Sequence, residues 1–215
     1  MPIKPQPTYP ISKWLMDKLI TLTFLTLFSP IFLFSVVGMG LSMLLRPKDR
    51  GTWFYRERRI SRGQEFDVLK FRILQEKVLE RGKREGKHAR LYEGDLDNLT
   101  WAGRYLLKKW YFDELPQLFN ILRGDMSLVG PRPWPVHMVE AQVEQGITYR
   151  HLIMAGWTGP VQIKKGHHSH LNPQQLDMEY LVQCITWPKW RLFKYDLDIL
   201  RETLQTMLEG KGLKY

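Results

Sequence analysis

The sequence has a single cysteine, Cys184, among its 215 residues, so no disulfide can form within the chain. It also has no Walker-type glycine-rich loop, no Gly-x-Ser-x-Gly turn and none of the common nucleic-acid-binding motifs. Cys184 has no sequence context typical of a thiol nucleophile. A disulfide scaffold, a P-loop enzyme and a serine hydrolase of this type therefore find no support.

Acidic residues are scarce: 22 Asp and Glu stand against 32 Lys and Arg, giving a net charge of +10. The sequence pI is about 9.7. Such an excess of positive charge favours an anionic partner, either nucleic acid, anionic lipid or a phosphorylated substrate. Composition alone does not choose among the three.

Residues 19–45 contain no charged residue. The segment is long enough to span a bilayer as a helix, since about 20 apolar residues suffice. A secretory signal has a shorter apolar region and a small-residue cleavage site, so we interpret this segment as a retained membrane anchor. Within it, Pro30 removes a backbone donor and clashes with the carbonyl of Thr26. The Ser29-Pro30 pair predicts a kinked spanning helix, or a broken one that re-enters the same leaflet.

Basic residues flank the apolar segment on both sides. Since cytoplasmic flanks attract Lys and Arg, the more basic C-terminal flank predicts a cytoplasmic main domain. A basic N-terminal flank as well favours the re-entrant alternative, with both termini in the cytoplasm. The residues concerned are Lys4, Lys13 and Lys18 before the segment, and Arg46, Lys48, Arg50, Arg56, Arg58 and Arg59 after it.

The remaining pattern predicts a mostly α fold with a small β element, of the α+β class. We divide the chain into a membrane segment with its flanks, residues 1–50, and a second domain, residues 51–215. Residues 52–74 favour a short hairpin, or a strand that leads to Lys70-Phe71-Arg72. Helices are expected over 100–110, 113–123, 134–154 and, as a pair with interfacial aromatic residues, 177–208. Residues 76–98 read as a short helix and an exposed loop.

Two motifs could carry chemistry. Asp113 and Glu114 are either acidic residues in the first turn of a helix or a pair that shares a divalent cation such as Mg²⁺. In Gly130-Pro131-Arg132-Pro133, the two prolines fix the backbone around one arginine. Such an arginine loses little entropy on binding a phosphate or uracil, although a rigid surface turn would have the same sequence.

Two further groups of residues are weaker candidates. On a strand, Lys70 and Arg72 would point to the same face and could meet one anion, or simply a solvated edge. His167, His168 and His170 suggest a zinc site, but no partner cluster with suitable spacing accompanies them. A polar or ligand-contacting loop is the alternative.

Together these motifs resemble the bacterial sugar transferases, the monotopic polyprenyl-phosphate phosphoglycosyl transferases in their minimal catalytic form. The residues that carry the resemblance span nearly the whole chain, and the block DELPQLFNILRGDMSLVGPRP is the most specific. FYRERRISRGQEFDVLKFR, WAGRYLLKKWYFDELPQ and AGWTGPVQ are similar to other blocks of the family, and Ser29-Pro30 matches its re-entrant helix.

The resemblance implies a two-step exchange. Asp113 would attack the β-phosphorus of a UDP-sugar and release UMP, and a polyprenyl (undecaprenyl) phosphate would then take the phosphosugar. Asp113 and Glu114 would hold Mg²⁺, and Arg132, framed by Pro131 and Pro133, would contact the nucleotide. Lys70, Arg72 and Arg104 would face phosphate. The expected place is the cytoplasmic face of the bacterial inner membrane, where the product would start a surface glycan.

The sequence departs from the family pattern after the Gly-x-Thr-Gly block, where Asn-Gly-Arg is usual and Lys164-Lys165-Gly166-His167 stands instead. Lys164, Lys165 or His167 would have to replace the missing arginine. A competing interpretation is a non-catalytic membrane-anchored protein that binds anionic lipid. A nucleic-acid-binding domain is a weaker alternative. The resemblance implies no nucleic acid as partner and is compatible with a homodimer.

Overall fold

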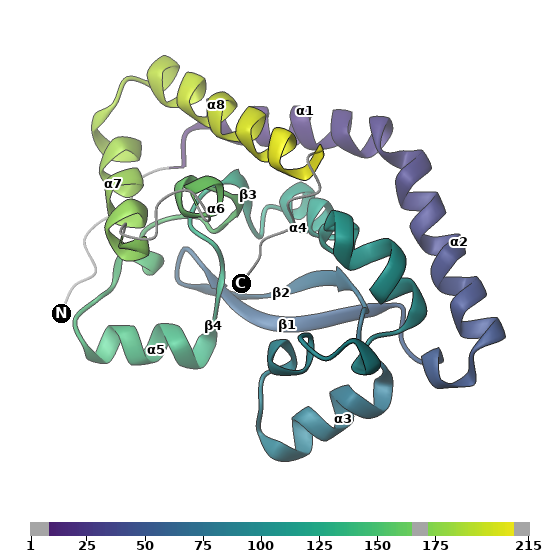
Figure 1. The fold of residues 1–215 in the computed structure, drawn as a ribbon. Coiled ribbons are helices and arrows are strands. Elements are labelled where there is room, and N and C mark those ends of the chain that lie inside the picture. Colours follow the sequence, from purple (N-terminus) through teal and green to yellow (C-terminus); the bar gives the residue numbers. More distant parts are fainter. Residues whose placement is uncertain (1–8, 165–171, 209–215) are drawn as a thin grey trace. The chain divides into compact units, whose positions relative to one another are not determined.

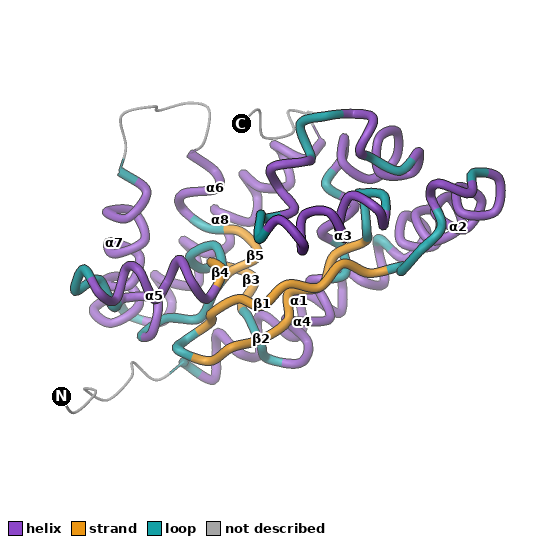
Figure 2. The backbone as a smooth tube through the Cα atoms, turned by 90° about the horizontal axis from the view of Figure 1, so that it is seen from below, coloured by secondary structure: helices purple, strands orange, loops and turns teal. Residues whose placement is uncertain are grey.

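The computed structural model describes residues 9–164 and 172–208, and it confirms a mostly helical fold with small sheets (Figures 1 and 2). Lys165, His167, His168 and His170 lie outside the described residues. The helices are α1 (Ile11–Leu27), α2 (Ser29–Leu45), α3 (Glu76–Glu85), α4 (Gln117–Arg123), α5 (Val136–Glu144), α6 (Pro160–Lys164), α7 (Pro173–Thr186) and α8 (Lys189–Leu208). The strands are β1 (Phe54–Ser61), β2 (Gln64–Phe71), β3 (Ser127–Val129), β4 (Trp134–Pro135) and β5 (Gly156–Thr158).

The chain forms two compact units built from interleaved segments. Unit 1 comprises Met1–Thr23, Glu57–Val68 and Gln117–Tyr215, whereas unit 2 comprises Phe24–Arg56 and Leu69–Pro116. The contiguous division at residue 50 stays a prediction. Each unit has its own core and is described by itself below.

The apolar N-terminal segment is broken where the sequence predicted a break. α1 ends at Leu27 and α2 begins at Ser29, with a bend of 60° between them. Pro30 lies in the first turn of α2, where its missing N–H costs no hydrogen bond. The Ser29 hydroxyl donates to the Thr26 carbonyl at 2.8 Å and satisfies a group that lipid could not. Among the described helices, none alone is long and apolar enough to cross a bilayer. The two helices of this bent pair, taken together, have the length and composition to do so.

Helix α2 has two different faces within unit 2. Its buried residues Ser35, Gly38, Met39 and Ser42 recur at helical spacing, and an added Cβ on Gly38 would lie 2.5 Å from the Leu106 side chain. The other face leaves large apolar side chains exposed: Leu33, Phe34, Val37, Leu41 and Leu44. An uncovered apolar face of this size is typical of a surface that meets lipid or another protein.

Strands β1 and β2 form the predicted hairpin, in a three-stranded sheet with the order β2-β1-β4 (Figure 1). The two-residue turn has positive φ at both positions, 50° at Arg62 and 73° at Gly63, as the twist of a tight hairpin requires. In unit 1, Arg59 pairs with Pro135 and Ile60 with Trp134, which fixes the chain just after the Gly-Pro-Arg-Pro segment.

The core of unit 1 surrounds the short parallel pair β3 and β5. Every residue of these two strands is buried, and α8 packs against both. The expected helical pair near the C-terminus is confirmed as α7 and α8, separated by Trp187-Pro188. The helix expected over 134–154 is shorter, because α5 ends at Glu144 before Gly146, which has a φ of 81°.

Two of the N-terminal lysines make contacts inside unit 1. Lys13 is buried and pairs with the Asp196 carboxylate of α8. Lys18 donates to the Ile121 carbonyl at 2.8 Å, near the C-terminal end of α4. The start of α1 is thus bound to the globular part of unit 1. This anchoring favours a re-entrant pair over a spanning helix, because a spanning helix would separate its two ends by the bilayer.

Replacing Pro30 with leucine should allow α1 and α2 to join and part of the population to span the membrane. The topology is measured with a membrane-impermeant thiol reagent on Ser12→Cys, in a Cys184→Ala background. We expect periplasmic labelling only after Pro30→Leu, not after the control Val36→Leu in the middle of α2. Identical labelling of the two variants would contradict the role given to the break.

Candidate active site

The two adjacent carboxylates lie in a short 3₁₀ turn of unit 2, η6 (Phe112–Glu114). Tyr111, immediately before it, adopts a left-handed conformation with a φ of 57°, which is uncommon for a residue with a bulky side chain. The Glu114 N–H donates to the Tyr111 carbonyl at 3.0 Å and closes the turn. Strained residues of this kind concentrate at functional sites, where the surrounding structure holds them in place.

The sequence predicted one helix over residues 113–123, and the structure corrects this. The 3₁₀ turn ends at Glu114, and α4 begins only at Gln117. Pro116 is the reason, because it has no N–H to donate to the Phe112 carbonyl, which instead accepts a 3₁₀-type hydrogen bond from the Leu115 N–H at 3.2 Å. Asp113 and Glu114 are therefore not in the first turn of α4.

Asp113 is buried, and its environment favours the neutral carboxyl. Loss of hydration raises its pKa from 3.8 to about 7. The Lys70 ammonium opposes this shift, whereas the negative charges of Glu114 and Glu93 add to it. The carboxyl therefore titrates near neutral pH, which suits a nucleophile or a proton acceptor.

Lys70 and Glu114 form an ion pair next to this carboxyl. Lys70 Nζ lies 2.7 Å from Glu114 Oε1, and the two side chains are 21% and 12% exposed. Lys70 comes from the end of β2 and Glu114 from the 3₁₀ turn, so the pair joins these elements within unit 2. A fixed positive charge beside Asp113 is a suitable neighbour for an anionic substrate group.

Arg72 occupies a different environment from the one expected. Because β2 ends at Phe71, the strand alternation that would pair Arg72 with Lys70 does not reach it. Its side chain is 1% exposed and donates to three backbone carbonyls: Asp49 O at 2.6 Å, Thr52 O at 2.6 Å and Leu74 O at 2.7 Å. These contacts make Arg72 a brace inside unit 2 and not a residue that faces solvent.

Arg104 is the exposed arginine of unit 2 nearest in sequence to the carboxylates. It belongs to a five-residue π-helix, η4 (Gly103–Leu107), a rare conformation that is frequent at functional sites. Gly103 permits a close approach of this helix to Ile73, since an added Cβ would lie 2.4 Å from the Ile73 carbonyl oxygen. The Arg104 guanidinium lies 5.2 Å from the centre of the Tyr105 ring. Its contact with phosphate stays a prediction.

The carboxylates offer a limited donor set for a metal ion. Within residues 9–164 and 172–208, no group of three or more His, Cys, Asp or Glu side chains could hold a cation. Mg²⁺ commonly uses only one or two carboxylates and completes its octahedron with water and substrate phosphates. Asp113 and Glu114 fit this mode and do not fit a closed protein cage.

The Gly-Pro-Arg-Pro segment lies in unit 1, between β3 and β4. Its backbone is fixed by the Gly-x-Thr-Gly block, because Gly130 N–H donates to Thr158 O and Gly156 N–H to Pro131 O, both at 2.8 Å. The strands approach so closely that a Cβ on Gly156 would lie 2.1 Å from Gly130 N. Two motifs that were separate in the sequence therefore form one structural element.

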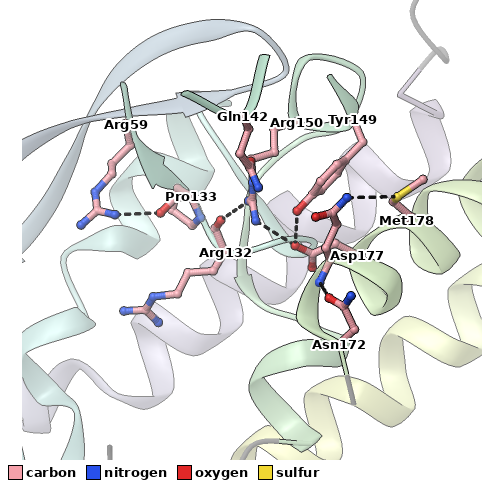
Figure 3. A network of polar contacts seen from close by, with 10 residues as sticks. Arg59, Arg132, Pro133, Gln142, Tyr149, Arg150, Asn172, Asp177 and Met178 are labelled. Carbon is pink, nitrogen blue, oxygen red and sulfur yellow. Dashed lines mark hydrogen bonds and ion pairs between the residues drawn. The ribbon is translucent and has the colours of Figure 1, made fainter. Parts of the chain in front are cut away.

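The next two carbonyls after that of Pro131, those of Arg132 and Pro133, accept hydrogen bonds from arginines (Figure 3). Arg59 Nη1 donates to Pro133 O at 3.0 Å, and Arg150 Nη1 donates to Arg132 O at 2.7 Å. The Arg132 side chain is partly exposed and points away from Arg150. Its contact with a nucleotide stays a prediction.

The site residues that the sequence predicted thus fall into two groups. Lys70, Asp113 and Glu114 come together in unit 2, whereas Pro131, Arg132 and Pro133 share a loop in unit 1. Lys164 is the last residue of α6 in unit 1. Sequence reasoning missed Glu93 in unit 2 and Arg150 and Asp177 in unit 1. Asp177 alone carried a signal, an acidic residue between Leu176 and Tyr180 on the apolar face of α7.

Comparison with known proteins gives one family. The model described as bacterial sugar transferase matches residues 8–210. A protein of Aeromonas hydrophila named UDP-N-acetylgalactosamine-undecaprenyl-phosphate N-acetylgalactosaminephosphotransferase is 30% identical over 98% of this chain and 47% of its own length. The exopolysaccharide production protein ExoY of Rhizobium meliloti is 35% identical over 87% of this chain and 81% of its own.

A third relative, from Xanthomonas campestris, is named UDP-glucose:undecaprenyl-phosphate glucose-1-phosphate transferase. It is 30% identical over 84% of this chain and 36% of its own length. The chain spans about half the length of the first curated relatives that it matches.

Replacing Arg72 with lysine should lower the free energy of unfolding by about 2–4 kcal/mol, because the single lysine nitrogen cannot reach all three carbonyls that Nε, Nη1 and Nη2 reach, and buried acceptors lose their partners. The exposed Arg104→Lys variant is the control and should change it by less than about 0.5 kcal/mol. Denaturant unfolding in detergent measures both. Equal effects of the two substitutions would contradict the bracing role of Arg72.

Replacing Asp113 with asparagine should raise the melting temperature more at pH 8 than at pH 5.5. The pKa of Asp113 is raised from 3.8 to about 7 in the fold, so the folded state keeps a proton that the unfolded chain has released. Its contribution to stability therefore falls as pH rises through this window, and asparagine escapes the loss. Each kcal/mol corresponds to about 2–4 °C in a protein of this size.

Differential scanning fluorimetry across this pH range measures the effect. The exposed Asp198→Asn variant of α8 serves as the control and should follow the unmodified protein at every pH. A difference between Asp113→Asn and the unmodified protein that stays constant with pH would show that Asp113 is not held in its neutral form.

Proposed function

The chain belongs to the bacterial sugar transferase family, and from that premise we propose that it transfers a sugar-1-phosphate from a UDP-sugar to undecaprenyl phosphate. The reaction releases UMP and makes the first lipid-linked intermediate of a surface glycan, such as an exopolysaccharide, a capsule, an O-antigen or a glycoprotein glycan. The names of the relatives from Aeromonas hydrophila and Xanthomonas campestris support this substrate pair.

The observation that carries the proposal is the buried Asp113 carboxyl beside the Lys70–Glu114 ion pair. A non-catalytic lipid-binding protein needs only basic charge and amphipathic helices. It gains nothing from a carboxyl whose pKa is raised to about 7 next to a fixed ammonium, in a turn that follows a strained tyrosine. Perturbed pKa values of this kind are typical of reaction centres.

In the first step, an oxygen of the Asp113 carboxylate attacks the β-phosphorus of the UDP-sugar. The bond from this phosphorus to the bridging oxygen breaks, and UMP leaves with that oxygen. In the second step, an oxygen of undecaprenyl phosphate attacks the same phosphorus and the Asp113 carboxylate is released. Two steps let two bulky substrates use one site in turn.

The surrounding residues neutralise and orient charge, which is the main need of phosphoryl transfer. Lys70 stabilises the Asp113 carboxylate and the transferred phosphoryl group. Asp113 and Glu114 would hold Mg²⁺, which supplies charge neutralisation to the phosphates. Arg132 would contact the nucleotide, and Arg104 a phosphate. Arg72 acts indirectly, through the backbone that it braces.

The lipid acceptor stays in the bilayer, so the site must lie at the membrane surface. The bent pair of α1 and α2, with its exposed apolar face, is suited to enter the cytoplasmic leaflet of the inner membrane without crossing it. Aromatic and basic residues of α8, such as Trp190, Phe193 and Arg191, are suited to the headgroup region.

The experiment measures UMP release by purified protein in nanodiscs with Mg²⁺, undecaprenyl phosphate and a panel of UDP-sugars. We expect release with at least one sugar and a loss of at least about 10³-fold in Asp113→Asn, since the nucleophile is gone. Asp198→Asn, the exposed control, should keep full activity. A folded protein that releases no UMP with any sugar, but still binds anionic vesicles, would favour the lipid-binding alternative.

The same assay gives a test by pH. UMP release should increase about tenfold between pH 6 and pH 8 if Asp113 must lose a proton near pH 7. Because the Lys70 charge lowers the Asp113 pKa, Lys70→Met should move the midpoint of this profile to higher pH at the same Mg²⁺ concentration. Lys77→Met, exposed on α3, should leave the midpoint unchanged. A Lys70→Met profile that coincides with that of the unmodified enzyme would contradict the assignment.

A further inference from the structure

The Gly-Pro-Arg-Pro loop of unit 1 is held mainly through its carbonyl groups. Pro131 and Pro133 have no N–H to donate, so the loop offers few donors of its own. The carbonyls of Pro131, Arg132 and Pro133 accept bonds from the Gly156 N–H, Arg150 Nη1 and Arg59 Nη1 in turn. The conformation of the loop therefore depends on donors supplied by other segments.

Arg150 is held by contacts on all three of its side-chain nitrogens. Its side chain is 7% exposed, and each of its three nitrogens has a partner. Nη1 donates to Arg132 O at 2.7 Å, Nη2 to the Asp177 carboxylate at 2.9 Å, and Nε to the Gln142 side chain at 3.1 Å (Figure 3). The guanidinium also lies 4.2 Å from the centre of the Trp134 ring.

The partners of Arg150 are themselves fixed and come from three different segments. Asp177 Oδ2 also accepts a hydrogen bond from the Tyr149 hydroxyl at 2.9 Å, and both side chains of this bond are buried. Asp177 belongs to α7, Gln142 to α5 and Trp134 to β4. One guanidinium thus links the carbonyl of Arg132 to the packed core of unit 1.

We propose that Arg150, supported by Asp177 and Tyr149, is a positioning residue that presents the Arg132 guanidinium to the nucleotide. This inference rests on the proposed function, in which Arg132 contacts the UDP-sugar. The Arg132 side chain points away from the Arg150–Asp177 pair, so Arg150 acts through the backbone and does not touch the substrate (Figure 3). The three bonds come from three separate nitrogens of the planar guanidinium, and the single nitrogen of a lysine cannot reach all three acceptors.

The first test compares UDP binding by calorimetry in Mg²⁺ for Arg150→Lys, Arg132→Ala and the double variant. Arg150→Lys keeps the charge beside Asp177 and should weaken UDP binding about tenfold, with a raised KM for the UDP-sugar and a nearly unchanged kcat. The double variant should bind no more weakly than Arg132→Ala alone, because Arg150 acts through Arg132. Additive losses in the double variant would overturn the proposal.

A second variant covers the case in which Arg150→Lys does not fold. Tyr149→Phe keeps Arg150 and removes only the hydroxyl that holds Asp177, so we expect a smaller rise in the Kd for UDP. The control is Arg201→Lys, which changes an exposed arginine of α8 in the same unit and should leave UDP binding unchanged. A Tyr149→Phe protein with the same Kd as the unmodified protein would also count against the network.

Hydrogen exchange without nucleotide separates this inference from the proposed function. In Arg150→Lys or Tyr149→Phe, the Gly130 and Gly156 amides should exchange about tenfold or more faster, while amides of α8 stay unchanged. Unchanged exchange at both glycines in a folded variant would overturn the positioning role. An unmodified protein that neither binds UDP nor releases UMP would instead sink the proposed function, and hydrogen exchange would still decide the role of Arg150.

Discussion

The ion pair between Lys70 and Glu114 is the interaction on which the account of the site depends. It spans 2.7 Å, joins the end of β2 to the turn that holds Asp113, and keeps a positive charge beside a buried carboxyl. Without the ammonium, burial and two neighbouring acids would keep the Asp113 carboxyl protonated to still higher pH. The pair thus keeps the pKa of the Asp113 carboxyl near 7, while the carboxyl itself stays buried.

In each unit, a buried arginine fixes part of the backbone. Arg72 in unit 2 and Arg150 in unit 1 both donate to backbone carbonyls of segments that have no regular secondary structure. A guanidinium can hold two or three carbonyls in fixed directions, which short strands and proline-rich loops cannot do for themselves. In this chain, arginines therefore serve as internal braces as well as candidates for substrate contact.

Much of this structure could be predicted from the sequence, because the relevant signals are local. The break at Ser29-Pro30, the hairpin around Gly63 and the helical pair before and after Pro188 follow from proline, glycine and apolar spacing. The family motifs marked Asp113 and Arg132. Local sequence patterns failed where tertiary contacts determine the role of a residue. Arg72 was expected on a strand, facing an anion or a solvated edge, and is a buried brace. No pattern near Arg150 in the sequence indicates that it holds Arg132.

The central claim is that Asp113 attacks the sugar phosphate, and intact mass spectrometry tests it most directly. The protein is mixed at pH 8 with Mg²⁺ and its UDP-sugar, without undecaprenyl phosphate, and quenched in acid. The account predicts a mass gain of one phosphosugar, located by fragmentation on Asp113, with one UMP released per labelled chain and none in Asp113→Asn. A phosphosugar on another residue, or turnover with acceptor and no labelled protein, would contradict it.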